Sequence, residues 1–342
     1  MITIKDIARI AGVSKSTVSR VLTDSGYVNE DTKRKIEDVM KEYGYQPSAS
    51  ARNLSKRETR TIGVIVPEIG NSFFSEVLSG ITEIVDRNDL TLIYCNTDNN
   101  ALKEEKALKM LAGQRVRGMI LTPAIDYSEP NVVKKLRELL NKLNAPVVFV
   151  DRDMENSKWD GVFYENFQSA YCATEVLIKE GHQTIGIITG DLNLKIARDR
   201  FKGYCQAMED YHIPVYDKHI YHGDFQTNTA YKLSKQMFES GDIPDAIFTC
   251  NNLTSLGFIK AARENKIKLG RDIAAIGIDH VEVLDIIDYN FSCVTRDAVE
   301  MGRKAMNLLL DRIENPTKER TISVMPYRLV LKGSEKKVNK AI

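Results

Sequence analysis

The stretch IKDIARIAGVSKSTVSRVL, residues 4–22, decides how the N-terminal part of this 342-residue chain folds. Its first apolar residues recur at the spacing of an amphipathic helix as far as Ala11. Gly12 and Val13 then interrupt the pattern, and a glycine at such a point is typical of a tight turn. The sequence therefore predicts a short helix followed by a turn.

Two further helices are predicted after this turn. Ser14 is placed to cap the second helix, in which Val18 and its apolar neighbours can face the first. Asn29 caps the third helix, which has acidic residues in its positively polarised first turn and Gly44 just past its end. Three short helices with a glycine turn after the first describe a helix-turn-helix unit.

The second predicted helix has a polar face suited to a polyanion. Ser, Thr, Lys and Arg fill that face, and no acidic residue occurs from residue 14 to residue 23. A helix that meets phosphates and base edges needs this composition. The first 60 residues carry 12 Lys and Arg against 8 Asp and Glu, whereas the rest of the chain carries 36 against 39. We therefore favour DNA binding over the alternative, a small helical domain with a solvated polar face.

Residues 4–22 closely resemble the N-terminus of lactose-repressor (LacI/GalR) family transcription regulators, and YGYQPSASARNL, residues 43–54, is similar to the family's hinge helix. The resemblance implies that the second helix enters the major groove of a pseudopalindromic double-stranded DNA operator. It implies base reading by Lys15, Ser16 and Arg20, and phosphate contacts from Thr3, Ser14, Thr17, Ser19, Asn29 and Thr32.

The hinge residues add a minor-groove contact to this expectation. By the same resemblance, Leu54 wedges between base steps, and the small side chain of Ala51 allows close approach to the DNA. The alternative for Leu54 is an ordinary apolar residue packed within a linker.

From Thr61 onward, short β-rich apolar runs alternate with amphipathic stretches, which predicts doubly wound α/β layers. The predicted strands are residues 62–66, 91–95, 118–121, 146–150, 185–188, 246–249 and 274–278. The predicted helices are residues 74–88, 101–114, 169–180, 198–210, 227–240 and 254–265. Some 270 residues of this pattern exceed one ordinary open sheet, so we expect two lobes with a ligand cleft between them.

The body also resembles the family, whose core is similar to periplasmic sugar-binding proteins. The fold class is thus an all-α helix-turn-helix head with a hinge helix, followed by an α/β two-lobed core of doubly wound parallel sheets. The predicted boundaries are 1–46 for the DNA-binding domain, 47–60 for the hinge helix and linker, 61–162 plus 292–323 for the first lobe, 163–291 plus 324–333 for the second lobe, and 334–342 for a polar tail.

The resemblance assigns cleft positions to seven residues: Asn71, Phe73, Arg200, Phe225, Asn251, Asp279 and Arg296. Amide, carboxylate and guanidinium groups suit a polyol, and the aromatic rings can cover the apolar face of a sugar. The neighbouring Phe74 is expected in the core rather than in the cleft wall. The effector is therefore expected to be a small carbohydrate-like molecule.

The sequence leaves two interpretations of the effector's charge open. Arginine stands at position 296 where many relatives have glutamine, so Arg296 with Arg200 predicts an anion, a sugar acid or a sugar phosphate. The alternative is an internal salt bridge from Arg296 to Asp297, Asp279 or Asp151.

Other functional classes find little support in the sequence. Five scattered cysteines and five histidines lack the spacing of a metal site, and no Walker, GxSxG or GxGxxG motif is present, so we expect no metal, no cofactor and no enzyme activity. Neither a signal peptide nor a membrane-spanning run is found, which predicts a cytoplasmic protein without a membrane partner. A transporter's solute-binding protein and a sugar-modifying α/β enzyme are the remaining alternatives.

We therefore expect a sequence-specific transcriptional repressor of carbohydrate metabolism genes, controlled by its effector. Family resemblance implies a homodimer, since two heads read two half-sites. Residues 333–342 are too short and polar for the leucine heptad helix of the family's tetramers.

Overall fold

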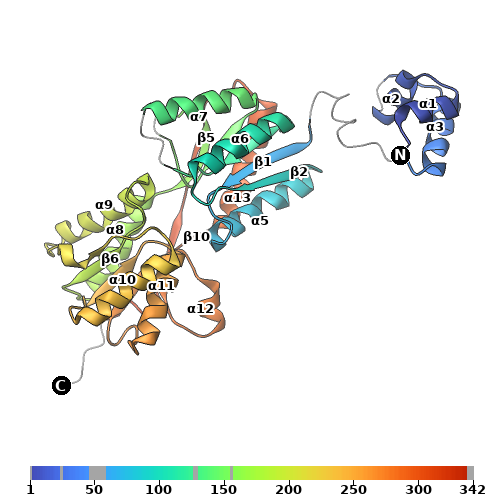
Figure 1. Cartoon of the computed structure of the whole chain (residues 1–342). Helices are drawn as coiled ribbons and strands as arrows, with labels where there is room; N and C mark the ends of the chain where they lie inside the picture. The colour runs from blue at the N-terminus through green and yellow to red at the C-terminus, as the bar shows by residue number, and fades with distance from the viewer. Residues whose placement is uncertain (1, 24–25, 46–58, 126–129, 155–156, 337–342) are drawn as a thin grey trace.

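The computed structural model describes residues 2–23, 26–45, 59–125, 130–154 and 157–336. The predicted hinge helix, with Ala51 and Leu54, lies outside the described residues, as does the chain beyond residue 336. Within the described part, an all-α head is followed by a two-lobed α/β core, as the sequence predicts (Figure 1).

The head is a three-helix unit built from α1 (Ile4–Ala11), α2 (Lys15–Thr23) and α3 (Glu30–Glu42). Its small core consists of six buried side chains, Ile7, Ala8, Ala11, Val18, Ile36 and Val39. Gly12 ends α1 in the left-handed region, at a φ of 69°, where a residue without a Cβ is favoured. The predicted helix-turn-helix is confirmed.

The first lobe contains a six-stranded sheet in the order β11-β5-β4-β3-β1-β2, in which all neighbours pair in parallel. Its strands are β1 (Thr61–Val66), β2 (Thr91–Asn96), β3 (Gly118–Leu121), β4 (Val147–Val150), β5 (Asp160–Tyr164) and β11 (Ile322–Met325). One face packs against α5 (Ser72–Arg87) and α13 (Ala298–Glu314), and the other against α6 (Ala101–Gln114) and α7 (Pro130–Leu143).

Helices α5 and α13 pack unusually closely, because glycine lies at their crossing. A Cβ on Gly80 would lie 1.9 Å from the carbonyl oxygen of Val299, and one on Gly302 would lie 2.0 Å from that of Val77. Only glycine fits at either position without moving a helix. The crossing therefore fixes how α13 covers the first sheet.

The second lobe repeats the scheme in the strand order β12-β10-β9-β8-β6-β7. Its strands are β6 (Ile185–Ile188), β7 (Ile220–Tyr221), β8 (Ala246–Thr249), β9 (Ala274–Ile278), β10 (Ser292–Arg296) and β12 (Tyr327–Val330), the last antiparallel to β10. The helices are α8 (Asn166–Lys179) and α9 (Lys195–Asp210) on one face, and α10 (Thr227–Ser240), α11 (Asn252–Glu264) and the short α12 (Glu282–Ile286) on the other, with a single 3₁₀ turn at Asp217–His219.

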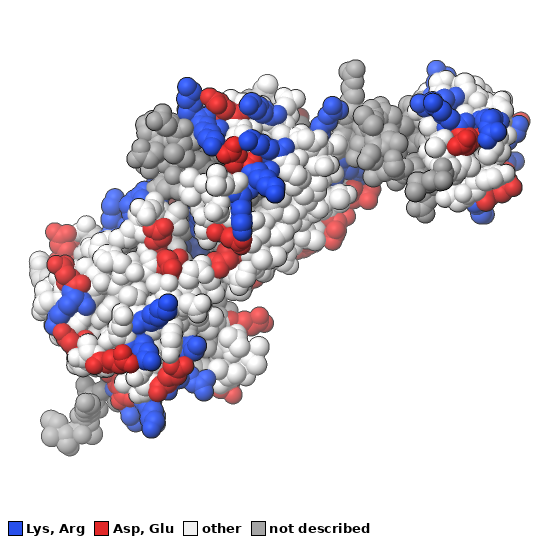
Figure 2. Space-filling model, in the orientation of Figure 1, with Lys and Arg blue, Asp and Glu red and all other residues white. Residues whose placement is uncertain are grey.

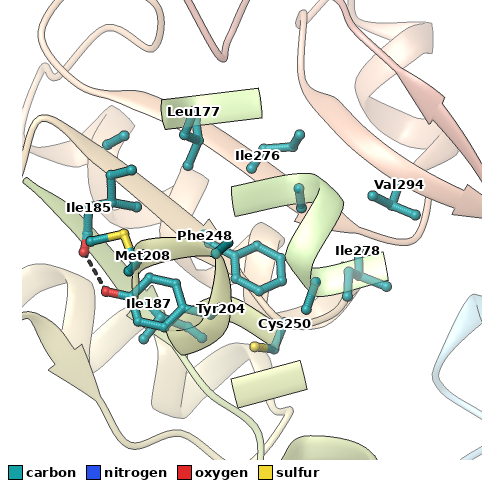
Figure 3. Packing of buried hydrophobic residues seen from close by; sticks show 14 of the residues in the cluster. Leu177, Ile185, Ile187, Tyr204, Met208, Phe248, Cys250, Ile276, Ile278 and Val294 are labelled. Atoms are coloured by element: carbon teal, nitrogen blue, oxygen red, sulfur yellow. Dashed lines mark hydrogen bonds between the residues drawn. The ribbon is translucent and has the colours of Figure 1, made fainter. Parts of the chain in front are cut away.

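The core under α8 and α9 is densely packed. Figure 3 shows the ring of Phe248 and the side chain of Ile276 among the aliphatic residues of this cluster. The buried hydroxyl of Tyr204 donates to the carbonyl oxygen of Ile185 at 2.6 Å, so its one polar group is satisfied. A rigid second lobe can thus hold the residues that follow its strands in fixed positions.

The lobe boundaries differ from those predicted, because the chain passes between the lobes three times. The segment 292–296 was assigned to the first lobe, but β10 pairs with β9 and belongs to the second. Residues 163–164 and 324–325 belong to the first sheet, since β11 pairs with β5 as far as Met325 and Tyr164. The lobe to which such a short strand belongs is decided by the strand with which it pairs, and local sequence pattern does not predict that partner.

The predicted polar tail also begins too early. Ser334 and Glu335 are buried in the second lobe, with exposed fractions of 2% and 1%. The Ser334 hydroxyl accepts from the backbone N–H of Ser292, and the Ser334 carbonyl oxygen accepts from that of Ala275, each at 2.7 Å. Residues 334–336 therefore extend the second lobe.

Candidate functional site

The head presents the predicted base-reading residues on one surface. Lys15, Ser16 and Arg20 on α2 are exposed, whereas Val18 between them is buried in the head core. Helical periodicity thus separates an apolar inner face from a polar outer face. The outer face of α2 is free to enter a DNA groove.

The predicted phosphate contacts gather at helix N-termini. Thr3 caps α1 through a capping box with Asp6, Asn29 caps α3, and the Ser14 hydroxyl accepts from the backbone N–H of Thr17 at 3.1 Å before α2. Thr17, Ser19 and Thr32 are half-buried. Helix N-termini carry partial positive charge and unpaired N–H groups, so they suit phosphate oxygens.

Sequence reasoning missed one exposed aromatic in the head. Tyr27 lies between α2 and α3 with 89% of its surface exposed. An aromatic residue in a turn rich in Ser, Gly and Asp was the available signal. Because most of the Tyr27 side chain faces solvent, it can contact DNA or another protein without leaving a buried position.

A cavity of about 530 Å³ lies between the two lobes, at the carboxyl ends of the strands. All seven predicted effector residues line it. Phe74 lies in the first-lobe core as expected, but it also lines the cavity, so its exclusion from the cleft wall was wrong. The lining residues that sequence reasoning did not select include Glu68, Asp98, Asn99, Arg152, Asp191, Asn193, Asp224 and Gln226.

Arg296 connects the two lobes through a buried ion pair. Its Nε and Nη2 donate to the carboxylate oxygens of Asp279 at 2.6 and 2.8 Å, and its Nη1 donates to Asp151 at 3.0 Å. Burial opposes the charged guanidinium, but the two carboxylates raise the pKa of Arg296 above its ordinary value. Asp297 takes no part, since its side chain caps α13. The internal salt bridge, one of the two readings left open by the sequence, is thus present.

Arg200 is also held by the protein. It is 2% exposed, its Nε donates to Asn166 Oδ1 at 2.9 Å, and its Nη1 donates to the carbonyl oxygen of Cys250. Burial, assisted by the nearby Arg296, lowers the pKa of Arg200 to about 10, so it stays charged at neutral pH. Its guanidinium carbon lies 5.5 Å from the centre of the Phe225 ring, which covers it from the side.

Five of the cavity residues adopt left-handed backbone conformations. Asp98, Asn99, Asp151, Phe225 and Asp279 have φ values of 49°, 52°, 64°, 67° and 71°. This region is uncommon for residues other than glycine, and it is especially unfavourable for a bulky side chain such as that of Phe225. A strained backbone conformation of this kind persists where the surrounding structure holds the residue in place, and such residues cluster in ligand-binding and active sites.

Several polar contacts join the rims of the lobes. The Asn252 amide, from the second lobe, donates to Asn71 Oδ1 and to the hydroxyl of Ser72, each at 2.9 Å, and Gln226 donates to Glu68 at 2.9 Å. Asn71 caps α5, and Asn251 caps α11. The lobes are therefore held close around the cavity by residues at helix starts.

The first-lobe wall is braced by Arg152 and a buried carboxyl group. Arg152 donates to the carbonyl oxygens of Pro123 and Ala124 and to Asn99 Oδ1. Glu104 accepts from the backbone N–H of Ala124 at 2.6 Å, and burial raises the pKa of its carboxyl to about 7. The signal for Arg152 was its position directly after a predicted strand.

The cavity lining is acidic overall. It contains six carboxylates, from Glu68 and five aspartates, against the three guanidinium groups of Arg152, Arg200 and Arg296. Two of those carboxylates share Arg296, so no cation is left in excess there.

In the part of the chain that the structure describes, no helix is long and apolar enough to cross a membrane.

Comparison with known proteins gives matches over both parts of the chain. Residues 3–48 match the model of bacterial regulatory proteins of the lacI family, and residues 59–329 match that of periplasmic binding proteins and the sugar-binding domain of the LacI family. The HTH-type transcriptional repressor PurR of Vibrio atlanticus is 34% identical over 340 residues, covering 99% of this chain and all of the relative. PurR of Pasteurella multocida is 32% identical, covering 98% and 99%.

Solved structures agree with this fold. The lac repressor dimer bound to operator and the anti-inducer ONPF superimposes with a TM-score of 0.83 at 23% identity, covering 98% of this chain and 99% of that one. A LacI family regulator from Enterococcus faecium with bound ribose gives a TM-score of 0.71 at 26% identity, covering 82% and 100%. With a DNA-binding head, a two-lobed core and relatives matched end to end, the chain belongs to the LacI family of bacterial regulatory proteins.

Proposed function

We propose that this protein is a dimeric transcriptional repressor of carbohydrate metabolism genes, whose binding to a pseudopalindromic operator is controlled by a small ligand between the lobes. The observation that carries the proposal is the outer face of α2, where Lys15, Ser16 and Arg20 are exposed beside a buried Val18. The repressor names of relatives that span nearly the whole chain support it.

The ligand that suits the cavity best is a small neutral ring bearing hydroxyl or amide groups, with a carbohydrate as the first candidate. Arg296 is already neutralised by Asp279 and Asp151, and the remaining lining has more carboxylates than cations. A sugar acid or sugar phosphate would be repelled by that lining. Phe73 and Phe225 supply apolar surface for a sugar ring or for a planar heterocycle.

Dimer formation is supported by an exposed apolar face beside α11 and α12. Val283 and Ile287 are 49% and 52% exposed and line a shallow groove with Leu256 and Tyr289, which is bordered by Lys260, Arg263 and Glu264. Ile286, at the end of α12, is 73% exposed. Apolar side chains grouped in this way mark an interaction surface. Since two heads read two half-sites, a second copy of this chain is the occupant that the proposal requires.

DNA reading is tested by selecting bound duplexes from a random pool and measuring their affinity. We expect a pseudopalindrome to be enriched, and we expect Arg20→Ala to lose specificity because a bidentate base contact is worth about 1–3 kcal/mol. Lys41→Ala, an exposed residue in the last turn of α3, is the matched control. Failure to enrich any sequence would argue against the proposal.

Ligand class is tested by thermal shift against neutral sugars, nucleobases, nucleosides, sugar acids and sugar phosphates. A neutral compound at 100 times its Kd should stabilise the protein by about 2.7 kcal/mol. Asp191→Asn should reduce the shift, whereas Asp217→Asn, which lies outside the cavity lining, should not. A shift caused by an acid or phosphate but not by its neutral parent would contradict the assignment.

A further inference from the structure

The outer surface of α6 and α7, called here the α6–α7 face, is strongly basic. Six exposed lysines lie on it: Lys103, Lys106, Lys109, Lys134, Lys135 and Lys142. Within the described residues of these two helices the acidic side chains are Glu104, which is buried, Glu105 and Glu138. Figure 2 shows Lys and Arg gathered over this part of the first lobe, whereas the two signs alternate on the second.

Part of this charge is paired on the face itself. Glu105, in the seam between the helices, accepts from Lys109 and Lys135 at 2.7 Å each, and these two hydrogen bonds lower the pKa of its carboxyl to about 2. Lys103 pairs with Asp98. Lys106, Lys134 and Lys142 have no acidic partner among the residues that the structure describes. Three positive charges therefore face the solvent.

The face belongs to the lobe that the head is joined to. The Thr59 hydroxyl, just after the connecting segment, donates to the carbonyl oxygen of Arg115 at the end of α6. Residues 46–58 connect this point to the head and can span at most about 45 Å. DNA held by the head is thus kept near this lobe at a high effective concentration.

We propose that the α6–α7 face binds the phosphate backbone of DNA flanking the operator, without regard to sequence. The inference rests on the proposed function, because the head must bring the DNA to this lobe. Each helix has 14 residues and is about 21 Å long, which matches about six base pairs of duplex. Lysine ammonium groups act there as point charges that release counterions from the DNA.

The test compares the full-length protein with the triple variant K106Q/K134Q/K142Q. Binding to fluorescein-labelled duplexes of about 20 and about 60 base pairs, each centred on the pseudopalindrome enriched from the random pool, is measured by anisotropy between about 50 and 200 mM salt, and circular dichroism checks the fold. The matched control is K202Q/K232Q/K268Q, three exposed second-lobe lysines without an ion pair in the described structure.

On the long duplex, each subunit that loses its three phosphate contacts should reduce the salt slope by up to about 2.7. With one subunit's face on the DNA, the wild type should lose about 40-fold more affinity than the triple variant across that salt range, and with both faces on the DNA it should lose the square of that factor. The short duplex is already occupied by the two heads, which lie about ten base pairs apart, so the triple variant and the wild type should have the same salt slope on it. The control should follow the wild type on both.

Two outcomes would overturn the inference, and they differ from a failure of the proposed function. If the triple variant has the wild-type slope on the long duplex, the face does not bind DNA. If its loss is equally large on the short duplex, the lysines act at the operator and not on flanking DNA. Failure of the wild type to enrich any sequence from the random pool would instead reject the proposed function.

Discussion

Replacing Arg296 with methionine tests whether the ion pair between the lobes is what holds them together. The change leaves the carboxylates of Asp279 and Asp151, which are 6% and 4% exposed, without their cation. Removing one partner of a buried pair costs about 3–5 kcal/mol, because an uncompensated charge remains in a medium of low polarity. With a urea dependence of about 1–3 kcal/mol per molar, the denaturation midpoint should fall by about 1–5 M.

The assay is urea denaturation followed by far-ultraviolet circular dichroism, with two comparison variants. Arg303→Met breaks a pair with Glu83 whose side chains are 38% and 32% exposed, so it should cost less than about 1 kcal/mol. Neutralising both carboxylates as well, in R296M/D151N/D279N, should recover most of the loss. If Arg296→Met lowers the midpoint no more than Arg303→Met does, the ion pair is not a major source of stability.

Three further predictions follow from other parts of the molecule. The pKa of Glu104 is about 7 in the folded protein against an ordinary 4.5, so the free energy of unfolding of the wild type falls as the pH rises between these values. The stability advantage of Glu104→Gln over the wild type should therefore grow by about 3 kcal/mol from about pH 5 to about pH 8. A difference in urea midpoints that stays constant over this pH range would contradict the prediction. Gly80→Ala should destabilise the first lobe by about 2–3 kcal/mol through its clash with Val299, whereas Gly113→Ala, with open space in α6, should stabilise it by about 1 kcal/mol in the same assay. Ile286→Glu, at a 73% exposed position, should weaken the dimer at least tenfold by equilibrium sedimentation, and an unchanged dimer would show that another face is used.

Strong local patterns predicted most of the fold. The seven apolar runs became β1, β2, β3, β4, β6, β8 and β9, and the helices at 101–114 and 227–240 have the predicted bounds. Apart from β2, whose residues are half-buried or exposed, these elements are buried on one stripe or on both faces, so their hydrophobic period is visible in the sequence. The strands β5, β7, β10, β11 and β12 were missed, as were the helices α7 and α13. Strands β7, β11 and β12 are mostly half-exposed, and all five are fixed by pairing with strands distant in the sequence.

The sequence predicted part of the cavity lining, and it named the ion pair of Arg296 as one of two readings without deciding between them. All seven selected effector residues line the cavity, since each follows a strand or begins a helix near the carboxyl ends of the sheets. Asp151 lies 145 residues and Asp279 lies 17 residues from Arg296 in the sequence, so no local spacing shows that they contact it. The acidic residues Glu68, Asp98 and Asp224 were missed for the same reason, since isolated carboxylates are common in the chain.

The three passages of the chain between the lobes also constrain the order in which a newly synthesised chain can fold. The head is continuous in sequence, so it can form as soon as it leaves the ribosome. The first lobe cannot, because it needs α13 and β11, which come after the strands β6 to β10 of the second lobe in the chain. Until residue 325 has emerged, a finished DNA-binding head is attached to a lobe that lacks α13 on one face of its sheet and β11 at its edge. A chain cut short before residue 298 would thus lose the regulatory core while keeping its head intact.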